Sequence, residues 1–349
     1  MITQQAIQLL KDLIQIESFS EKEHKTADRI EAWFREYNIP FQRQVNNVWA
    51  TNQQFNPELP TLLLNSHHDT VKPNQAYTRD PFSPDIVDGK LYGLGSNDAG
   101  GALVSLIALF THYYAHPNPK YNLLMAATAE EEIAGKKSLR GLLKELPKID
   151  FAIVGEPTLM DLAIAEKGLV VFEAIIKGTP SHAAHPNADN PLMKIPAVIQ
   201  ALESITFDKV SPVLGPVKVT LTQIEAGSQH NVVPSEVKLV IDVRVNECYT
   251  NNEIEQHLKN ALPCEVHARS LRLKSSSIDA NHPLVKAGIA LGKKTYGSPT
   301  LSDQAALDCP SLKLGPGDST RSHSADEYIY VKEIEEGIAF YIELLKKIL

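Results

Sequence analysis

The stretch Thr61-Leu62-Leu63-Leu64-Asn65-Ser66-His67-His68-Asp69 joins a short apolar run to a polar ending. A continuous apolar run of this length, bounded by polar residues, is typical of a buried β-strand. A His and an Asp two residues apart at the end of such a strand can bring a nitrogen ligand and a carboxylate to one point. The stretch therefore predicts a strand that ends at a candidate metal ligand, His67.

Four other places along the chain offer metal-ligating side chains in similar settings. Asp98 lies in a Gly-rich turn, Glu131-Glu132 follow a second apolar run, Glu156 follows a third, and His323 lies near the C-terminus. Carboxylate and imidazole are both ligands of Zn²⁺ and related ions. We therefore expect these residues and His67 to form one metal centre that the fold assembles.

Each candidate also has a simpler interpretation. Asp98 could cap the helix that follows it, since Asp is common at that position. Glu130-Glu131-Glu132 could be a solvated acidic run, Glu156 a turn residue and His323 a surface residue. The acidic run, however, follows a buried strand directly, where clustered charges are costly unless cations offset them. Because all the simple interpretations would have to coincide at strand ends and turns, we favour the metal centre.

Alternating strands and helices predict an α/β fold for most of the chain. Apolar runs predict strands at 61–64, 121–127 and 151–154, and helical spacing predicts helices at 99–114 and 136–145. Two amphipathic helices are expected in the first forty residues, the second beginning at a capping box formed by Ser20 and Glu23. Short buried strands separated by helices indicate a mostly parallel sheet with helices on both faces. Functional groups then belong at the carboxyl ends of the strands, where the candidate ligands lie.

The pattern changes near Gly168. The expected order becomes strand, helix, two strands, helix and strand, at 169–176, 191–205, 217–222, 237–244, 252–262 and just after Cys264. Alternation of apolar and polar residues in the middle strands indicates an antiparallel sheet with one wet face, and the order is that of a ferredoxin-like α+β domain. Beyond 274 the α/β pattern returns, with a helix at 283–296 and a strand at 311–314. We therefore expect a domain of residues 1–167 and 275–349, interrupted by a second domain of residues 168–274.

Composition limits the classes of function for the 349 residues. The formal net charge of −8 is spread along the chain, which is unfavourable for binding nucleic acid or an anionic membrane. Three cysteines without paired spacing suit a reducing compartment. Residues 1–18 lack the pattern of a signal peptide, and no apolar stretch is long enough to span a bilayer. These features predict a cytoplasmic protein that binds no nucleic acid and no membrane.

The candidate residues also carry a resemblance to a known family. Five segments resemble, in order, the metal-site motifs of the co-catalytic zinc amidohydrolases: Ser66-His67-His68-Asp69-Thr70-Val71, Gly93-Leu94-Gly95-Ser96-Asn97-Asp98, Thr128-Ala129-Glu130-Glu131-Glu132, Gly155-Glu156-Pro157-Thr158 and Ser322-His323-x-x-Asp326-Glu327. That family includes acetylornithine deacetylase, succinyl-diaminopimelate desuccinylase, aminoacylases and certain carboxypeptidases. The likeness spans essentially the whole chain, and residues 168–274 fall where the family has its lid and dimerisation domain.

This resemblance implies a ligand set for two zinc ions per subunit, for which Co²⁺ can substitute. Asp98 is implied to bridge both ions. His67 and Glu156 are implied to bind one ion, and Glu132 and His323 the other.

Two carboxylates are implied to act without binding metal. Glu131 takes the role of a general base that accepts a proton from water and later passes it to the leaving nitrogen. Asp69 holds His67 in the tautomer that binds metal. The chain departs from the family at Ser66, where Gly is usual, and at Ala99-Gly100-Gly101, where Met-Lys-Gly is usual. The second departure removes a positive charge close to the metals and leaves the substrate preference open.

Residues 168–274 contribute three more candidates. Gly178-Thr179-Pro180-Ser181-His182-Ala183 resembles the family's lid motif, which implies that His182 reaches a neighbouring subunit's active site and stabilises an oxyanion. Arg244 and Asn231 are implied to bind the carboxylate of the substrate. Their simpler interpretations are a loop histidine, an ion pair of Arg244 with Asp242, and a loop amide.

The activity implied by the resemblance is hydrolysis of the amide bond of an N-acyl amino acid by a homodimer. N-Acetylornithine, in arginine biosynthesis, is the first expectation for the substrate. Alternatives with the same chemistry are an N-acetyl- or N-succinyl-citrulline, succinyl-diaminopimelate and a dipeptide. A one-metal peptidase and a non-catalytic binding homologue are further alternatives. An intact Glu131 beside a full ligand set is unfavourable for the non-catalytic homologue.

Overall fold

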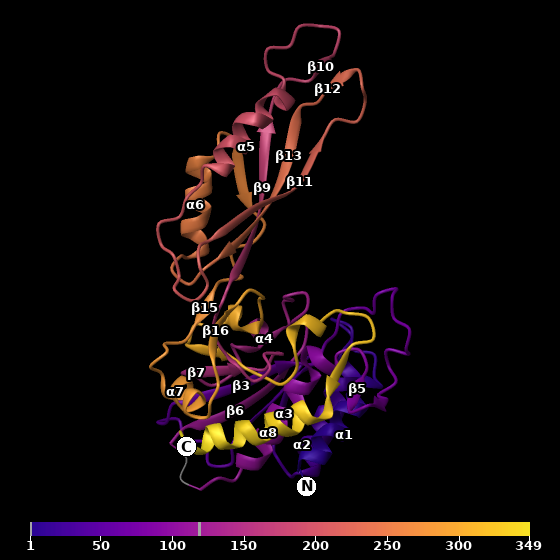
Figure 1. The fold of residues 1–349 in the computed structure, drawn as a ribbon, viewed down its shortest axis with the longest axis vertical. Helices are drawn as coiled ribbons and strands as arrows, with labels where there is room; N and C mark the ends of the chain where they lie inside the picture. Colours follow the sequence, from indigo (N-terminus) through magenta and orange to yellow (C-terminus); the bar gives the residue numbers. More distant parts are fainter. Residues whose placement is uncertain (1, 118–119) are drawn as a thin grey trace. The chain divides into compact units, whose positions relative to one another are not determined.

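The computed structural model describes residues 2–117 and 120–349, and the chain divides into two compact units (Figure 1). Unit 1 comprises the chain up to Ile164 together with Ser277–Tyr296 and Ser302–Leu349, and unit 2 comprises Ala165–Ser276 and Gly297–Leu301. The expected domain boundaries, before 168 and after 274, lie close to the main division. The segment Gly297–Leu301 also belongs to unit 2, which the sequence did not predict.

Unit 1 is built on a nine-stranded sheet. Its order is β1 (Gln42–Gln44), β2 (Asn47–Thr51), β6 (Asn122–Thr128), β3 (Thr61–His67), β7 (Phe151–Val154), β17 (Ser311–Lys313), β8 (Leu162–Glu166) and β15 (Ser276–Ser277), with β16 (Thr295–Ser298) paired to β8. The four central strands β6, β3, β7 and β17 are parallel, and β2 and β8 flank them in antiparallel pairs. Every residue of β3 and β6 is buried, as expected for strands covered on both faces. The mostly parallel α/β fold that the sequence predicts is therefore confirmed.

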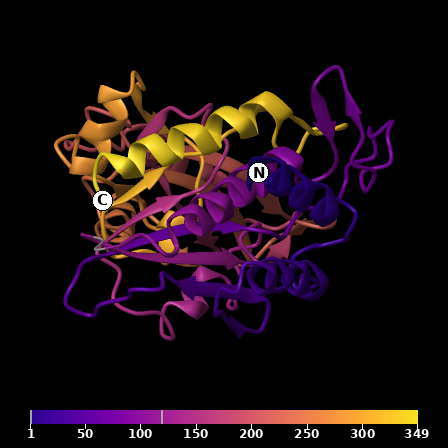
Figure 2. The same ribbon diagram turned by 90° about the horizontal axis from the view of Figure 1, so that it is seen from below.

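Helices cover both faces of this sheet. On one face α1 (Ile2–Ile14), α3 (Gly101–Tyr113) and α8 (Val331–Lys346) pack against one another, as Figure 2 shows. On the other face α4 (Leu139–Leu142) packs on a buried cluster that includes Leu63 and Leu124. Side chains of a strand alternate between faces, so the neighbours of Leu63 in β3 point toward the first group of helices. Further helices are α2 (His24–Glu36), which packs on β2, and α7 (Pro283–Ala290), which packs on α8.

Shorter elements complete unit 1. A three-stranded antiparallel sheet consists of β4 (Ile86–Val87), β5 (Lys90–Tyr92) and β18 (Tyr328–Tyr330), and short helical turns occupy η1 (Ser96–Gly100), η3 (Asp303–Ala306) and η4 (Ser319–Arg321). Within residues 2–117 and 120–349, no helix combines the length and the hydropathy needed to cross a membrane.

Two helices predicted for unit 1 are too long. The helix expected at 136–145 is reduced to Leu139–Leu142, consistent with the low helix propensity of Gly141 in its interior. The helix expected at 283–296 ends at Ala290. Gly292 has a φ of 84°, the left-handed conformation that commonly terminates helices, and β16 follows. The strand β8 is an element that the sequence analysis did not predict.

The capping box predicted for Ser20 and Glu23 is also wrong. Helix α2 begins at His24, with Glu23 as its N-cap, and the Glu23 side chain makes no capping hydrogen bond. Both side chains have other partners in the tertiary structure: Ser20 donates to Asp69, and Glu23 accepts from the backbone of Glu130. The spacing of Ser20 and Glu23 therefore did not predict a capping box correctly, because their side-chain oxygens take part in tertiary hydrogen bonds instead.

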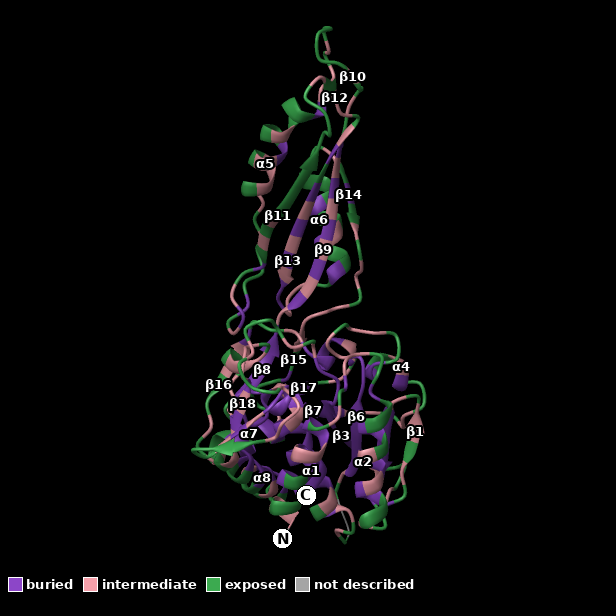
Figure 3. Ribbon diagram, turned by 90° about the vertical axis from the view of Figure 1, so that its right-hand side faces the viewer, coloured by how far each residue is buried: buried purple, intermediate pink, exposed green. Residues whose placement is uncertain are grey.

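Unit 2 has the strand and helix order expected from the sequence. Its antiparallel sheet runs β11 (Lys218–Ala226), β13 (Glu236–Val245), β9 (Gly168–Lys177) and β14 (Glu265–Ala268), with helices α5 (Ile195–Glu203) and α6 (Asn251–Ala261) and the 3₁₀ turn η2 (Pro191–Lys194). A core of Phe172, Leu239, Ile241, Ile254 and Leu258 joins sheet and helices. A separate strand pair consists of β10 (Ser181–His182) and β12 (Val232–Val233). The edge strand β11 is largely exposed, as Figure 3 shows, whereas β13 and β9 alternate between buried and less buried residues.

The central strands of unit 1 position the candidate site. In the sheet His67 is in register with Thr128, and Asn65 is in register with Val154. Because β3, β6 and β7 are parallel, the segments that follow them leave the sheet at the same edge. These segments carry Asp69, Glu131-Glu132 and Glu156.

Candidate metal centre

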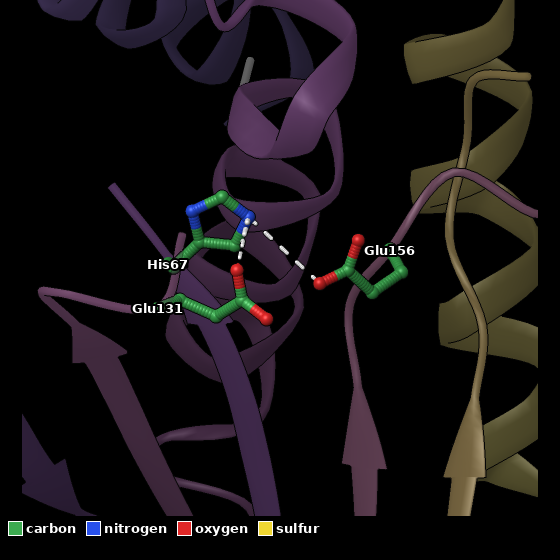
Figure 4. Close-up of side chains that lie close together, drawn as sticks. All are labelled: His67, Glu131 and Glu156. Atoms are coloured by element: carbon green, nitrogen blue, oxygen red, sulfur yellow. Dashed lines mark ion pairs between the residues drawn. The ribbon is translucent and has the colours of Figure 1, made fainter. Parts of the chain in front are cut away.

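His67, Glu131 and Glu156 converge at the carboxyl ends of β3, β6 and β7 (Figure 4). The imidazole Nε2 of His67 lies 3.8 Å from Oε1 of Glu156 and 4.0 Å from Oε2 of Glu131. His67 is 1% exposed, so its ring is held inside the protein. The three strand ends thus bring one imidazole and two carboxylates together.

Asp98 lies between the two histidines. Its Oδ1 is 3.3 Å from Nε2 of His67, and its Oδ2 is 3.6 Å from Nε2 of His323. The turn that presents Asp98 begins at Gly95, whose φ of 74° favours glycine and where a Cβ would lie 2.5 Å from a methyl carbon of Thr70. The Asp98–Ala99 peptide bond is cis. The two oxygens of one carboxylate therefore each lie close to a different histidine.

Glu327 fixes this turn from the C-terminal part of the chain. Its buried carboxylate accepts hydrogen bonds from the backbone N–H groups of Gly95 (3.1 Å), Asn97 (2.9 Å) and Asp98 (2.9 Å). Burial and the charge of Asp98 raise the pKa of Glu327 to about 8, although the three N–H donors oppose the rise. The segment that follows His323 thus holds the segment that presents Asp98.

His323 and Glu132 form the second half of the cluster. Nε2 of His323 lies 3.0 and 3.2 Å from the two carboxylate oxygens of Glu132. The loop of His323 is anchored through Asp326, which accepts from Thr78 and from the backbone of Arg79. The structure therefore brings all five candidate ligands into one cluster, although they come from segments far apart in the sequence.

Asp69 connects the ends of β3 and β6. Its Oδ1 accepts from the backbone N–H of Glu131 at 3.0 Å, and its Oδ2 accepts from that of Glu132 at 3.1 Å. Nδ1 of His67 lies 3.3 Å from Oδ1 of Asp69 but only 3.0 Å from the Asp69 backbone oxygen. The shorter contact favours the backbone oxygen as the acceptor of the Nδ1 proton, which leaves Nε2 as the nitrogen that would bind a metal ion.

This cluster fits a metal ion on two independent observations. Nε2 of His67 is a buried atom without a hydrogen-bond partner, although carboxylate oxygens surround it. In tetrahedral coordination with ligand distances of about 2.1 Å, neighbouring ligand atoms lie about 3.4 Å apart, close to the separations given above. Two groups have all their ligand atoms within 4.8 Å of one another, namely His67-Glu131-Glu156 and His67-Asp98-Glu132. The donor set of imidazole and carboxylate suits zinc and similar divalent ions.

Electrostatics of the side chains also favour a bound cation. Burial and the charge of Asp98 raise the pKa of Glu156 to about 8. Burial likewise raises the pKa of Glu131 well above its ordinary value, against the opposing effect of His67. The hydrogen bond to Glu132 raises the pKa of His323 to about 9. Carboxylates this close together repel one another when all are ionised, which raises the free energy of the site. A divalent cation among them offsets this repulsion.

Sequence reasoning missed two buried side chains beside the cluster. Asp303 in η3 accepts from Thr128 Oγ1 at 2.8 Å, and burial raises its pKa to about 6. Lys313 in β17 is 2% exposed, and its positive charge opposes the rise in the pKa of Glu156. The only sequence signal for Lys313 was a lysine inside the segment 311–314 that was expected to be a strand. Lys313 provides a buried positive charge in a chain that lacks the family's usual lysine after Asp98.

The remaining candidates all lie in unit 2. His182 on β10 is exposed, and the backbone of Ala183 donates to the backbone oxygen of Asn231, so His182 and Asn231 belong to neighbouring segments. Arg244 near the end of β13 makes two hydrogen bonds to Asp242, at 2.9 and 3.2 Å. This ion pair is the simpler interpretation that the sequence left open for Arg244.

Comparison with known proteins agrees with the geometry of unit 1. The profile of peptidase family M20/M25/M40 matches residues 63–347. A succinyl-diaminopimelate desuccinylase of Rhodospirillum centenum (strain ATCC 51521 / SW) is 27% identical over 378 residues, which cover 98% of this chain and 96% of that protein. A protein of the same name from Wolbachia pipientis subsp. Culex pipiens (strain wPip) is 26% identical over 375 residues, covering 97% of this chain and 92% of that one.

A solved structure shares the fold along the whole chain. Bacillus subtilis YXEP, described as a dinuclear metal-binding peptidase from the M20 family, matches with a TM-score of 0.73 and 17% identity, covering 99% of this chain and 97% of that one. The match of the family profile to most of the chain, together with the cluster of imidazole and carboxylate groups, identifies the class of protein. This chain is a member of peptidase family M20/M25/M40 and a metal-dependent amidohydrolase.

Proposed function

We propose that this enzyme hydrolyses the amide bond of an N-acyl amino acid with two zinc ions, for which Co²⁺ can substitute. Asp98 would be shared by the two ions, His67 and Glu156 would hold the first, and Glu132 and His323 would hold the second. The observation that carries this assignment is that Asp98 directs Oδ1 toward His67 and Oδ2 toward His323. Each histidine therefore faces a different oxygen of the same carboxylate, which supports two neighbouring sites.

Glu131 serves as the base in this proposal. Zinc supplies the polarisation that lowers the pKa of a bound water to about 7. The Glu131 carboxylate lies 4.0 Å from Nε2 of His67, and the backbone N–H of Glu131 donates to Asp69, so Glu131 is held beside the candidate ligands. Glu131 accepts the proton of the attacking water and then donates it to the departing nitrogen, which requires no other residue.

For the substrate, we place succinyl-diaminopimelate first. Both curated relatives described above carry the name of its desuccinylase, whereas the sequence analysis placed N-acetylornithine first. The alternatives with the same chemistry are N-acetylornithine, N-acetylcitrulline, N-succinylcitrulline and dipeptides. The loops that contact the acyl group and the side chain decide among them.

Unit 2 supplies substrate-binding residues through a homodimer in this proposal. Arg244 lies eight residues after Glu236, the start of β13, which corresponds to about 26 Å along an extended strand. Asn231 and His182 belong to the segments near the start of that strand. One chain therefore cannot place Arg244 and Asn231 on the same small carboxylate. Two subunits can, with Arg244 from one and Asn231 and His182 from the other.

One set of assays tests the function. The purified protein, reconstituted with Zn²⁺ or Co²⁺, is offered succinyl-diaminopimelate, N-acetylornithine, N-acetylcitrulline, N-succinylcitrulline and a dipeptide at equal concentration. We expect two metal equivalents per chain and the highest kcat/KM for succinyl-diaminopimelate. A higher kcat/KM for another compound would make that compound the proposed substrate in place of succinyl-diaminopimelate, and the proposed amide hydrolysis would stand. Absence of both metal binding and turnover would contradict the proposal, and a strict monomer at assay concentration would remove His182 from the mechanism.

A further inference from the structure

Ser20 and Glu23 lie in the connection between α1 and α2, and the mechanism proposed above does not use them. This connection is fixed to the segment after β3, because the backbone N–H of Thr70 donates to the backbone oxygen of Ser18 at 2.9 Å. Ser18 and Thr70 are both buried. The connection therefore lies beside the segment that carries Asp69.

Ser20 completes the hydrogen bonding of Asp69. Its hydroxyl donates to Oδ2 of Asp69 at 2.7 Å. Together with the backbone N–H groups of Glu131 and Glu132, the Asp69 carboxylate then accepts from three donors. Ser20 is the only side-chain hydroxyl among these three donors, and it shares Oδ2 with the backbone N–H of Glu132. Without the Ser20 hydroxyl, Asp69 is free to rotate away from one of the two backbone groups that it holds.

Glu23 makes a second connection to the same loop. Its Oε1 accepts from the backbone N–H of Glu130 at 3.2 Å and from that of Glu21 at 2.7 Å, and its Oε2 accepts from Asn46 Nδ2 at 2.7 Å. Glu23 is fully buried. A fully buried carboxylate is unfavourable unless its hydrogen bonds are satisfied, so its presence here requires these three donors.

These contacts converge on three consecutive residues. The backbone N–H of Glu130 is held by Glu23, and those of Glu131 and Glu132 are held by Asp69, which Ser20 in turn fixes. Glu130 has a φ of 55°, a left-handed conformation that is unfavourable for a residue with a side chain. A loop in this conformation needs outside contacts to keep it.

We propose that Ser20 and Glu23 are positioning residues that hold the loop Glu130–Glu132, so that the base Glu131 and the ligand Glu132 face the metal ions. This inference deepens the proposed function and rests on it. The connection between α1 and α2 would then support the catalytic loop. Its sequence pattern, that of a capping box, did not reveal this role.

The test compares four variants with the wild-type protein. Ser20→Ala removes the hydroxyl, and Ser20→Thr keeps it. Glu23→Gln keeps the size but replaces one accepting oxygen by an amide nitrogen. Ser83→Ala is the matched control, since the Ser83 hydroxyl donates at an exposed site to Asp85, a residue that the mechanism does not use.

Three quantities are measured on each folded variant: the Co²⁺ dissociation constant with its absorption spectrum, kcat and KM, and backbone hydrogen exchange of residues 129–133 in the metal-free protein. We expect Ser20→Ala and Glu23→Gln to weaken Co²⁺ binding and to lower kcat by about 10-fold or more, with KM changed less than about twofold. We also expect faster exchange of the loop in both variants. Ser20→Thr and Ser83→Ala are expected to match the wild type.

The outcomes separate this inference from the proposed function. If the wild type binds Co²⁺ and hydrolyses a substrate while Ser20→Ala and Glu23→Gln match it in all three measurements, the positioning role is wrong and the function stands. If the wild type binds no Co²⁺ and cleaves no N-acyl amino acid, the proposed function fails and the inference fails with it. A fall in kcat in which Ser20→Thr is as impaired as Ser20→Ala contradicts a role for the hydroxyl.

Discussion

Glu131 and Glu132 are adjacent in the chain, but their carboxylates have different neighbours. Glu132 lies 3.0 and 3.2 Å from the ring of His323, within the range of a direct pair. Glu131 lies 4.0 Å from His67, the longest of the contacts that His67 makes with carboxylates. The shorter contacts belong to the residue proposed as a ligand, and the longest contact of His67 with a carboxylate belongs to the residue proposed as the base.

At the residue scale we predict that Glu131→Gln lowers kcat by at least about 10²-fold while the protein still binds metal, because an amide cannot accept the proton. Turnover is measured with the best substrate of the panel, and metal content is measured by elemental analysis. Glu58→Gln, at the opposite end of β3 from His67, serves as the control with unchanged kcat. A Glu131→Gln variant with kcat within tenfold of the wild type would exclude Glu131 as the base.

At the scale of the element, α6 shows what a capping box looks like in this protein. Thr250 Oγ1 accepts from the backbone N–H of Glu253 at 3.2 Å, and Glu253 accepts in return from the backbone N–H of Thr250 at 2.7 Å. Ser20 and Glu23 have the same spacing but form no such pair. The difference lies in their surroundings, because Thr250 and Glu253 are exposed, whereas Glu23 is buried against Glu130.

We therefore predict that Thr250→Ala lowers the free energy of unfolding by about 0.5–2 kcal/mol, since it removes an N-cap. Thr250→Ser keeps the hydroxyl and is expected to change the free energy of unfolding little. Urea unfolding followed by circular dichroism, with hydrogen exchange of α6, provides the measurement. Equal destabilisation by both variants would point to lost packing of the methyl group instead of a lost cap.

At the scale of the whole molecule, the buried carboxylates couple stability to pH. In the metal-free protein the pKa values of Glu156 and Glu327 are raised to about 8 from an ordinary value of 4.5, chiefly by burial, and that of His323 is raised to about 9 from 6.5 by Glu132. Raised folded-state pKa values mean that the folded protein binds more protons than the unfolded one. The associated stability is present at low pH and is lost as pH rises through about 8. Asp69 and Asp98 have lowered pKa values, so their contributions are constant above about pH 5.

We predict that the melting temperature of chelator-treated protein falls by several degrees between about pH 5.5 and 8.5. Saturating Zn²⁺ or Co²⁺ is expected to reduce this slope, because a divalent cation stabilises the ionised carboxylates. The variant Glu327→Gln, which removes one of the titrating groups, should show a smaller slope than the metal-free wild type. Differential scanning calorimetry across this pH range gives the measurement. A melting temperature that rises with pH would contradict the assignment of these groups as protonated in the metal-free fold.

The sequence predicted the framework of this protein well because its strands are continuous apolar runs. Thr61–Leu64 and Phe151–Val154 lie in buried parallel strands, and the residues just after them meet at one edge of the sheet. Predictions failed where a local pattern had competing tertiary partners, as at Ser20 and Glu23, or where a glycine ended a helix, as at Gly292.

By itself the sequence determined the type of fold, the order of elements and the identity of the chemically active side chains, since hydrophobic periodicity and residue type are local properties. Tertiary structure alone decided which atoms meet: that Asp98 faces two histidines, that Glu327 holds its turn, and that Asp303 and Lys313 lie beside the cluster. These contacts join segments separated by about 30 to more than 200 residues, and a hydrogen bond forms only when its donor–acceptor distance is right to within a few tenths of an ångström. No local pattern specifies such distances, because they follow from the packing of the whole unit.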